Sequence, residues 1–460
     1  MATLLERDPN PQNFYASLIQ GQKFAVIPEL RLDSGDVLES CPVAYKTWGR
    51  LNESRDNVLV ICHALTGSSD VSDWWSPLLG GGKAFDPAHF FIFCANVLGS
   101  PYGSASPLTT DPRTGRPYAS EFPQTTVRDD VRAHKYVLDA LGVQSVAAVI
   151  GGSMGGMTTL EWPLCTATGY VRSIIPIATA ADHSAWGISW AETQRQCIYS
   201  DPKFDDGYYE PRPEGQPSAG LAAARMVAML TYRSCVSFDA RFGRKPQRQQ
   251  RARHVQEPPL DLPRTDVPIA AATVASAAAV GGRSERMKGW AARRDPSFSA
   301  QGYLHYQGQK FVQRFDANCY LHITNKMDAH DVTLGRTHAQ EIEGSTGDGE
   351  SILREVLAAA PPGALVVSVE TDALFLPEQQ ERLAACLANA TLAVLKSSDG
   401  HDGFLLEFEQ LGTLILDKLR RDFPQYYLSV LDGDVGLLDD VEGRTAQPGS
   451  GSLTGEVEAW

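Results

Sequence analysis

Short apolar runs alternate with amphipathic stretches toward both ends of the chain. Six of these runs are expected to form buried strands: NVLVICH, HFFIFCANV, SVAAVIG, VRSIIPIA, GALVVSVE and ATLAVLK. Apolar runs that alternate with helical stretches are typical of parallel βαβ units whose sheet is covered on both faces. An earlier pair, FAVIPELRL and PVAYKTW, is separated by DSGDVLES and predicts an antiparallel hairpin at the start of the fold.

One helix is well marked, in TTVRDDVRAHKYVLDAL at residues 125–141. A threonine can cap its first turn, and Asp129 and Asp130 lie where acidic side chains favour a helix start. Its apolar positions are Val127, Val131, Val137, Leu138 and Leu141.

The strand and helix alternation stops after Ile177 and resumes near Gly363. More than a hundred polar, aromatic and helix-prone residues lie between, too many for a loop in a compact core, so we expect a cap or lid. The predicted organisation is an N-terminal extension at 1–23, a core at 24–181, a cap insertion at 182–345, a second core part at 346–425 and a disordered tail at 426–460.

Biased composition marks a loop at residues 243–300 of the cap, which runs from RKPQRQQRARH through EPPLDLPRTDVP to AAATVASAAAVGG. A basic run can bind nucleic acid, but proline-rich and glutamine-rich neighbours favour a solvated, disordered loop. The alanine-rich piece is a candidate for a short helix. The acidic, glycine-rich stretch from Asp432 fits a disordered tail.

Charge and cysteine usage narrow the class of protein. The 460 residues carry a formal charge of −14, which disfavours nucleic acid as a partner. Eight cysteines are spread singly, several in apolar runs, as expected for buried thiols in a reducing compartment. We expect no signal peptide and no membrane segment, since no apolar run approaches the ~20 residues that a membrane helix needs. These features favour a cytoplasmic protein.

A candidate nucleophile stands in AAVIGGSMGGM. Gly151 to Gly155 fit G-x-S-x-G, with an apolar strand before and the helical pattern MTTLEWPLC after, so Ser153 is expected at the tip of a strained strand-to-helix turn. The alternative is a plain glycine-rich turn. A phosphate-binding loop is excluded, because no G-K-[ST] follows and G-x-G-x-x-G does not fit these glycines.

A serine nucleophile requires a histidine base and an acid that orients it. In this fold the chain order is serine, acid, histidine. His401 follows the last apolar strand, and Asp372 ends the strand GALVVSVE before it. The rival base, His330, lacks a preceding strand-end acid, and Asp399 and Asp402 lie too close to His401 in sequence to reach its far nitrogen.

An oxyanion hole needs backbone N–H groups, one of them from the residue after the nucleophile. That residue is Met154. The second donor is expected in the loop VICHALTGSSDV, at Leu65, where Gly67 lets the loop pass close to a substrate.

The chain also resembles the homoserine O-acetyltransferase family of the α/β-hydrolase superfamily, from about Phe24 to about Leu419, and is closer to its fungal forms. The resemblance is carried by VAYKTWGRLN, HALTGSSDV, NVLGSPYGSASP, RDDVRAHKYVLDALGV, GGSMGGMTTLEW, ETQRQCIYSDP, ARMVAMLTYRS, FDANCYLHITNKMDAHD and GHDGF. It implies an α/β-hydrolase fold, with a mostly parallel sheet, helices on both faces and a long helical cap insertion.

The resemblance assigns roles residue by residue. Ser153 corresponds to the nucleophile, Asp372 to the triad acid and His401 to the base. Arg225 matches the position that binds the amino-acid carboxylate, and Asp402 the one that faces its amino group. Without the resemblance, we would interpret Arg225 as a surface arginine and Asp402 as a helix cap.

The implied reaction is a ping-pong transfer of acetyl from acetyl-CoA, as co-substrate, to L-homoserine in methionine biosynthesis. No metal and no permanently bound cofactor are expected, and the family implies a homodimer. The alternatives are a related O-acyltransferase with L-serine or a deacetylcephalosporin as acceptor or a succinyl donor, and a serine esterase. A non-catalytic binding module would need a broken triad, and none is seen.

Overall fold

The computed structural model describes residues 2–246, 298–336 and 349–428. The chain divides into two compact units, one made of Met1–Ser237 with Gln307–Trp460 and the other of Phe238–Tyr306. All the candidate site residues belong to the first unit. Most of the expected loop at 243–300, with its alanine-rich helix, and all but the first residues of the expected tail at 426–460 lie outside the described residues.

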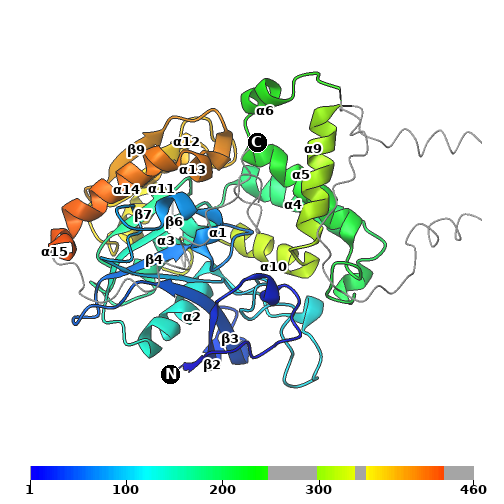
Figure 1. Cartoon of the computed structure of the whole chain (residues 1–460), viewed down its shortest axis with the longest axis horizontal. Helices are drawn as coiled ribbons and strands as arrows, with labels where there is room; N and C mark the ends of the chain where they lie inside the picture. The colour runs from blue at the N-terminus through cyan, green and yellow to red at the C-terminus, as the bar shows by residue number, and fades with distance from the viewer. Residues whose placement is uncertain (1, 247–297, 337–348, 429–460) are drawn as a thin grey trace, which may run out of the picture. The chain divides into compact units, whose positions relative to one another are not determined.

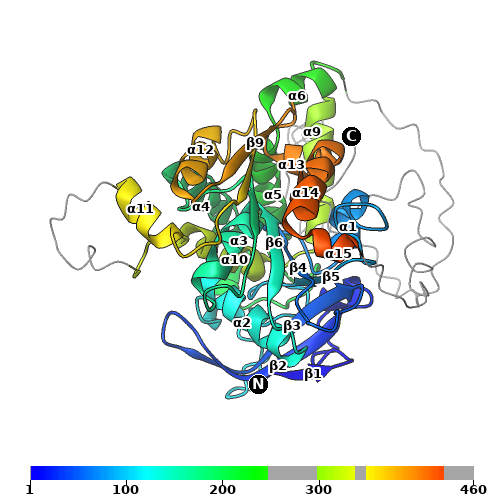
Figure 2. The ribbon, with the colours of Figure 1, turned by 90° about the vertical axis from the view of Figure 1, so that its left-hand side faces the viewer.

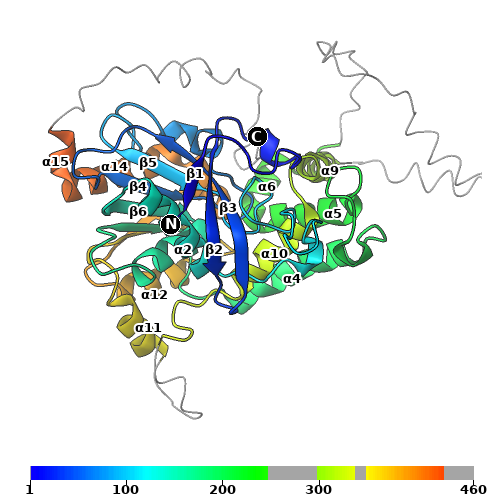
Figure 3. The same ribbon diagram turned by 90° about the horizontal axis from the view of Figure 1, so that it is seen from below.

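The first unit is built on a nine-stranded sheet with the order β1-β2-β3-β5-β4-β6-β7-β8-β9. The strands β5-β4-β6-β7-β8-β9 are parallel, and β1, β2 and β3 pair antiparallel. Figure 3 shows β1, β2 and β3 side by side. The strands are β1 (Thr3–Leu5), β2 (Lys23–Arg31), β3 (Val37–Trp48), β4 (Val58–Cys62), β5 (Phe91–Ala95), β6 (Val146–Gly152), β7 (Ile174–Ile177), β8 (Leu365–Val369) and β9 (Thr391–Leu395). The predicted mostly parallel sheet and its leading hairpin are confirmed, and the expected N-terminal extension contributes the edge strand β1.

Alternate residues of the central strands face opposite sides of the sheet. In β4, Val58 and Val60 pack in one buried cluster, while Leu59 and Ile61 pack in another. The first cluster includes side chains of α2, α3, α11 and α12, and the second those of α1, α13 and α14. Figure 2 shows α11 and α12 on one side of the sheet and α1 and α14 on the other. Because every residue of β4 is buried, its sequence reads as one apolar run rather than as an alternation.

The helices that flank the sheet follow the predicted alternation. They are α1 (Val71–Trp74), α2 (Val127–Ala140), α3 (Met154–Leu164), α11 (Gly349–Leu357), α12 (Pro377–Cys386), α13 (Gly403–Leu406), α14 (Phe408–Asp422) and α15 (Pro424–Tyr427). In α2, Thr126 and Asp129 form a reciprocal capping box, which explains why the predicted helix starts where it does. None of the helices in the described residues is long and apolar enough to cross a membrane.

The insertion between β7 and β8 is helical where it is described. Its helices are α4 (Ala185–Tyr199), α5 (Ser218–Tyr232), α6 (Cys235–Arg241), α9 (Ser299–Val312) and α10 (Ala317–Asp328). In the first unit, α4, α5 and α10 lie beside the sheet (Figure 1), and their buried side chains share a cluster with Met154 and Met157 of α3. In the second unit, the rings of Phe238 and Phe242 pack on Tyr303.

Candidate active site

Ser153 lies on a strained turn between β6 and α3. Its backbone adopts φ 58° and ψ −124°, a conformation that L residues rarely take and that is found where function fixes it. The turn is held by the end of β7, because the Ser153 N–H donates to the Ile177 carbonyl at 3.0 Å and the Thr179 hydroxyl donates to the Ser153 carbonyl at 2.8 Å. The side chain is 6% exposed.

Two of the glycines around this turn are required by close packing. A Cβ on Gly155 would lie 2.1 Å from the Cys62 carbonyl oxygen at the end of β4. A Cβ on Gly152 would lie 2.4 Å from the ring of Phe404. Gly155, a fixed glycine of G-x-S-x-G, therefore lets the turn pack against β4, and Gly152, at a variable position of the motif, lets the segment that follows β9 approach the turn.

The expected base and acid are hydrogen-bonded to each other. His401, in the 3₁₀ turn Gly400–Asp402, lies with its Nδ1 at 2.6 Å from Oδ2 of Asp372, and both side chains are buried. The other oxygen of Asp372 accepts hydrogen bonds from the N–H groups of Leu374 and Phe375, each at 2.9 Å. The carboxylate thus fixes a proton on Nδ1 of His401 and leaves Nε2 as the basic nitrogen.

Aromatic rings place this base next to the nucleophile turn. The His401 ring stacks on Phe375 with centroids 5.2 Å apart and meets the edge of Phe404 at 5.3 Å. Phe404 also packs on Gly152, the residue before Ser153. One phenyl ring therefore contacts both the imidazole of His401 and the residue before Ser153, although 248 positions separate Ser153 from His401 (401 − 153).

The rival histidine has a different environment. His330 follows α10 and is buried, and its carbonyl accepts a hydrogen bond from the N–H of His183 at 2.9 Å. Burial lowers the pKa of its imidazole. The hydrogen-bonded carboxylate that a base needs is at His401.

The loop expected to supply the second oxyanion donor is braced by a buried histidine. The Val97 N–H donates to Nε2 of His63 at 3.1 Å, so Nδ1 carries the proton and donates to the Ala64 carbonyl at 2.8 Å. Burial lowers the pKa of His63 to about 4, which keeps the ring neutral. Leu65 follows directly, and its side chain packs against the cluster that contains Met154.

Met154 is the first residue of α3. Its N–H therefore belongs to the first helical turn, where N–H groups have no partner within the helix. The positive end of the helix dipole points in the same direction and favours a developing negative charge. This is the arrangement that an oxyanion donor requires, and the roles of Leu65 and Met154 stay predictions.

Arg225 is a buried cation with unused hydrogen-bonding capacity. It is 2% exposed, on α5, and its guanidinium lies over the rings of Phe311 at 4.9 Å and Tyr232 at 5.5 Å. Within the described parts of the chain, its buried Nε and Nη1 have no hydrogen-bond partner. A buried guanidinium with idle donors is costly unless a ligand satisfies it, and a carboxylate has the matching geometry.

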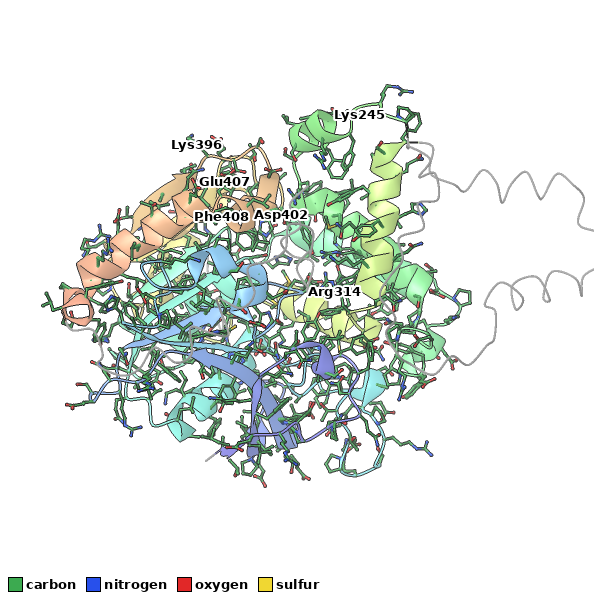
Figure 4. The ribbon with its side chains drawn as sticks, in the orientation of Figure 1. Lys245, Arg314, Lys396, Asp402, Glu407 and Phe408 are labelled. Carbon is green, nitrogen blue, oxygen red and sulfur yellow. The ribbon has the colours of Figure 1, made fainter. Side chains whose placement is uncertain are left out.

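Asp402 is buried beside the base and forms an ion pair that the sequence reasoning missed. Its Oδ2 lies 2.7 Å from Nε of Arg233, the residue that follows α5. The pKa of Asp402 is raised overall, chiefly by burial and further by Asp399, while the charges of Arg233, His401 and Arg225 act against this rise. Figure 4 labels Asp402 in this segment. Among the charges that oppose the effect of burial on this carboxylate, that of Arg233 is the strongest.

Four further side chains of the site were not predicted: Tyr232, Arg233, Phe375 and Phe404. Tyr232 lies seven residues after Arg225, which puts both on one face of α5, and this spacing could have indicated it. No metal site adds to this set, since no three His, Cys, Asp or Glu residues gather as ligands within residues 2–246, 298–336 and 349–428.

A mostly parallel sheet with a serine on a strained strand-to-helix turn defines a protein of the α/β-hydrolase class, and the family model for the alpha/beta hydrolase fold matches residues 57–408. The chain is 46% identical to the homoserine O-acetyltransferase of Cryptococcus neoformans var. grubii, over 92% of this chain and 93% of that protein. It belongs to the homoserine O-acetyltransferase family. It is also 47% identical to the Saccharomyces cerevisiae enzyme, over 88% of this chain, and 44% identical to the Emericella nidulans enzyme, over 100% of it.

Solved structures show the same fold at low sequence identity. Homoserine O-acetyltransferase from Bacillus anthracis matches with a TM-score of 0.68 and 20% identity, over 87% of this chain and 97% of that one. Esterase E22 matches with a TM-score of 0.66 and 22% identity, over 86% of this chain and 99% of that one. Transferases and esterases share this scaffold, so the acceptor has to be argued from the site.

Proposed function

We propose that this chain transfers the acetyl group of acetyl-CoA to the side-chain hydroxyl of L-homoserine, with Ser153 as the acetyl carrier. The names of curated relatives that are 42–47% identical over most of the chain support this activity. The observation that carries the acceptor is Arg225, a buried guanidinium in which Nε and Nη1 have no hydrogen-bond partner within the described residues, on the helix whose end contacts the segment of His401.

In the first half-reaction, Oγ of Ser153 attacks the thioester carbonyl while Nε2 of His401 takes the hydroxyl proton. The tetrahedral oxyanion accepts hydrogen bonds from the backbone N–H groups of Leu65 and Met154. One such donor is typically worth about 3 kcal/mol of the barrier. The carbon–sulfur bond then breaks, His401 returns the proton to the departing thiolate, and acetyl stays on Ser153.

In the second half-reaction, homoserine enters with its carboxylate on Arg225 and its ammonium toward Asp402. These two contacts hold its hydroxyl at the acyl-enzyme. His401 takes the hydroxyl proton, the oxygen attacks the acetyl carbonyl, and the proton passes back to Ser153 as the ester leaves. Acetyl-CoA acts as a substrate in this scheme, and no metal or permanently bound cofactor takes part.

The cap insertion has a purpose in this scheme, because an acetyl-serine intermediate is useful for transfer only if water is kept from it. We also propose that the enzyme is a cytoplasmic homodimer and serves methionine biosynthesis, as the family resemblance implies. Light scattering after size-exclusion chromatography tests the dimer.

The proposal is tested by measuring thiol release from acetyl-CoA with homoserine, with L-serine and without an acceptor. We expect steady turnover with homoserine and a single burst without an acceptor. Turnover with L-serine but not with homoserine would show that L-serine is the acceptor. Steady hydrolysis of acetyl esters at an equal rate with and without homoserine would make the enzyme an esterase. Succinyl-CoA in place of acetyl-CoA tests the donor.

A further inference from the structure

A single buried arginine contacts the carboxylates on both sides of the expected base. Arg233, at the end of α5, lies with Nη1 at 3.1 Å from Oδ1 of Asp399 and with Nε at 2.7 Å from Oδ2 of Asp402. Its side chain is 2% exposed. Asp399 precedes His401 by two residues and Asp402 follows it, so the guanidinium spans the base segment.

The same segment is pressed directly onto the backbone at the end of α5. Gly400 has φ 70°, and a Cβ on it would lie 2.7 Å from the Ser234 nitrogen and 2.9 Å from the Arg233 carbonyl carbon. Ser237 adds a hydrogen bond from its hydroxyl to Oδ1 of Asp399 at 2.8 Å. The helix that presents Arg225 and the turn that presents Asp402 therefore meet at Arg233.

We propose that Arg233 is a positioning residue that sets acceptor specificity, by holding Asp402 charged and at a fixed separation from Arg225, so that the site accepts the ammonium and carboxylate of an α-amino acid together. The inference rests on the proposed transfer to an amino-acid hydroxyl. Arg233 acts through Asp402, whose Oδ2 lies 2.7 Å from its Nε.

The charges around Asp402 explain why this ion pair matters. Two carboxylates, Asp399 and Asp402, meet one guanidinium at Arg233, which offsets part of the repulsion between them. The pKa of Asp402 is also lowered by the charge of Arg225 and by that of His401 when the imidazole is protonated. Without Arg233, Asp402 would be buried beside Asp399 and would take up a proton at higher pH, and a neutral carboxyl binds an ammonium poorly.

The base itself has supports that do not depend on Arg233. Asp372 holds Nδ1 of His401, and the rings of Phe375 and Phe404 pack on the imidazole. The Gly400 N–H also donates to the hydroxyl of Thr371 at 3.0 Å, from the β8 side. Loss of Arg233 should therefore harm acceptor binding far more than acetylation of Ser153.

The test compares Arg233→Gln and Arg233→Lys with the parent enzyme, using homoserine and 4-hydroxybutanoate, which lacks only the amino group. For Arg233→Gln we expect kcat/KM for homoserine to fall at least about tenfold, as for loss of a buried charge partner. Activity with 4-hydroxybutanoate and the acceptor-free thiol burst should stay within about threefold. Arg233→Lys, which keeps the buried charge, should recover part of the preference for homoserine.

The pH dependence provides a second readout. In Arg233→Gln, the acidic limb of kcat/KM for homoserine should move to higher pH, because Asp402 loses the neighbour that keeps it ionised. The acidic limb of the acceptor-free burst depends on His401 and should stay in place. Arg233→Lys keeps a cation at this position, so it should fold and allows the same comparison if the glutamine variant does not.

Arg195→Gln is the matched control. Arg195 is equally buried and contacts two carboxylates, Glu192 at 2.9 Å and Asp328 at 2.6 Å. It should lose stability without changing the ratio of homoserine to 4-hydroxybutanoate activity. Equal losses with both acceptors in the Arg233 variants, or the same change of ratio in Arg195→Gln, would overturn the inference. If the parent enzyme uses L-serine and not homoserine, the proposed function is wrong but the inference on Arg233 is not. The same test would then compare L-serine with its deamino analogue in the Arg233 variants.

Discussion

Nδ1 of His401 and Oδ2 of Asp372 lie 2.6 Å apart, and the second oxygen of that carboxylate is occupied by the N–H groups of Leu374 and Phe375. The aspartate is therefore fixed by its own turn before it orients the imidazole. Its bond determines which nitrogen of His401 carries the proton.

The variant Asp372→Asn should fold like the parent enzyme but should have almost no activity. An amide that turns its NH₂ toward Nδ1 would force the proton to Nε2, so the ring could no longer accept the proton of Ser153. We expect kcat to fall by roughly 10⁴-fold, as when the acid of a triad is made neutral. Steady-state thiol release measures this. The control is Asp182→Asn, which removes only the partly exposed pair with Arg382, and an equal loss there would contradict the assignment.

The strained backbone at Ser153 should lower the stability of the fold, although the side chain is needed for the reaction. Ser153→Ala should lose roughly 10⁴-fold or more in rate, and a loss below about tenfold would exclude it as the nucleophile. Glycine tolerates a φ of 58°, so Ser153→Gly should be equally inactive but more stable than Ser153→Ala by about 1 kcal/mol. Urea unfolding of both variants measures the difference, and equal stabilities would argue against strain at this turn.

Arg225→Met should stabilise the free enzyme while it removes acceptor binding. The substitution replaces a buried charge with idle N–H groups by an apolar side chain of similar length, and we expect the free energy of unfolding to rise by about 1 kcal/mol. The KM for homoserine should rise at least about tenfold, with the KM for acetyl-CoA nearly unchanged. Arg195→Met, which breaks two ion pairs, should lower stability instead. Equal changes in both KM values would indicate a structural arginine.

His63 should make the protein sensitive to acid. Its pKa is lowered to about 4 by burial, against about 6.5 in the unfolded chain, so the unfolded state binds more protons below pH 6.5. Stability contributed by the neutral ring is present above pH 6.5 and is lost as pH falls toward 4. Between pH 7 and pH 5 this amounts to about 2 kcal/mol for this one group.

The variant His63→Gln tests this contribution, since glutamine does not titrate. Urea unfolding at pH 7 and pH 5 should show a loss of stability that is smaller in the variant than in the parent by about 2 kcal/mol. His330→Gln provides a comparison at another buried histidine whose pKa is lowered. An unchanged difference between the two pH values in His63→Gln would contradict a neutral His63.

Features that depend on residues close together in the sequence could be predicted. The apolar runs predicted β4 to β9, and the glycine spacing with the chain order of serine, acid and histidine selected Ser153, Asp372 and His401. Asp372 and His401 lie 29 positions apart and are hydrogen-bonded as expected. Local signals also located the helix from Val127, because its cap and its periodicity agree.

Arg233 could not be found in the same way. Its partners, Asp399 and Asp402, come from a turn on the far side of the cap insertion, and nothing in the sequence around TYRS indicates that the two segments meet. The same holds for the contact between Phe404 and the serine turn, which is possible only because Gly152 has no side chain. Contacts of this kind arise from the assembly of distant segments, and periodicity carries no information about them.

β7 and β8 are neighbours in the sheet, with Ile177 opposite Val367, although the whole cap insertion separates them in the chain. Pairing of such distant strands closes a long loop and is slow. Ser153 precedes both strands in the chain, whereas Asp372 and His401 come after β8. The serine turn is therefore synthesised before the two strands can pair, and the acid and the base are synthesised after β8. A growing chain should therefore stay inactive until its last strands dock, so the onset of activity during refolding reports the completion of the sheet.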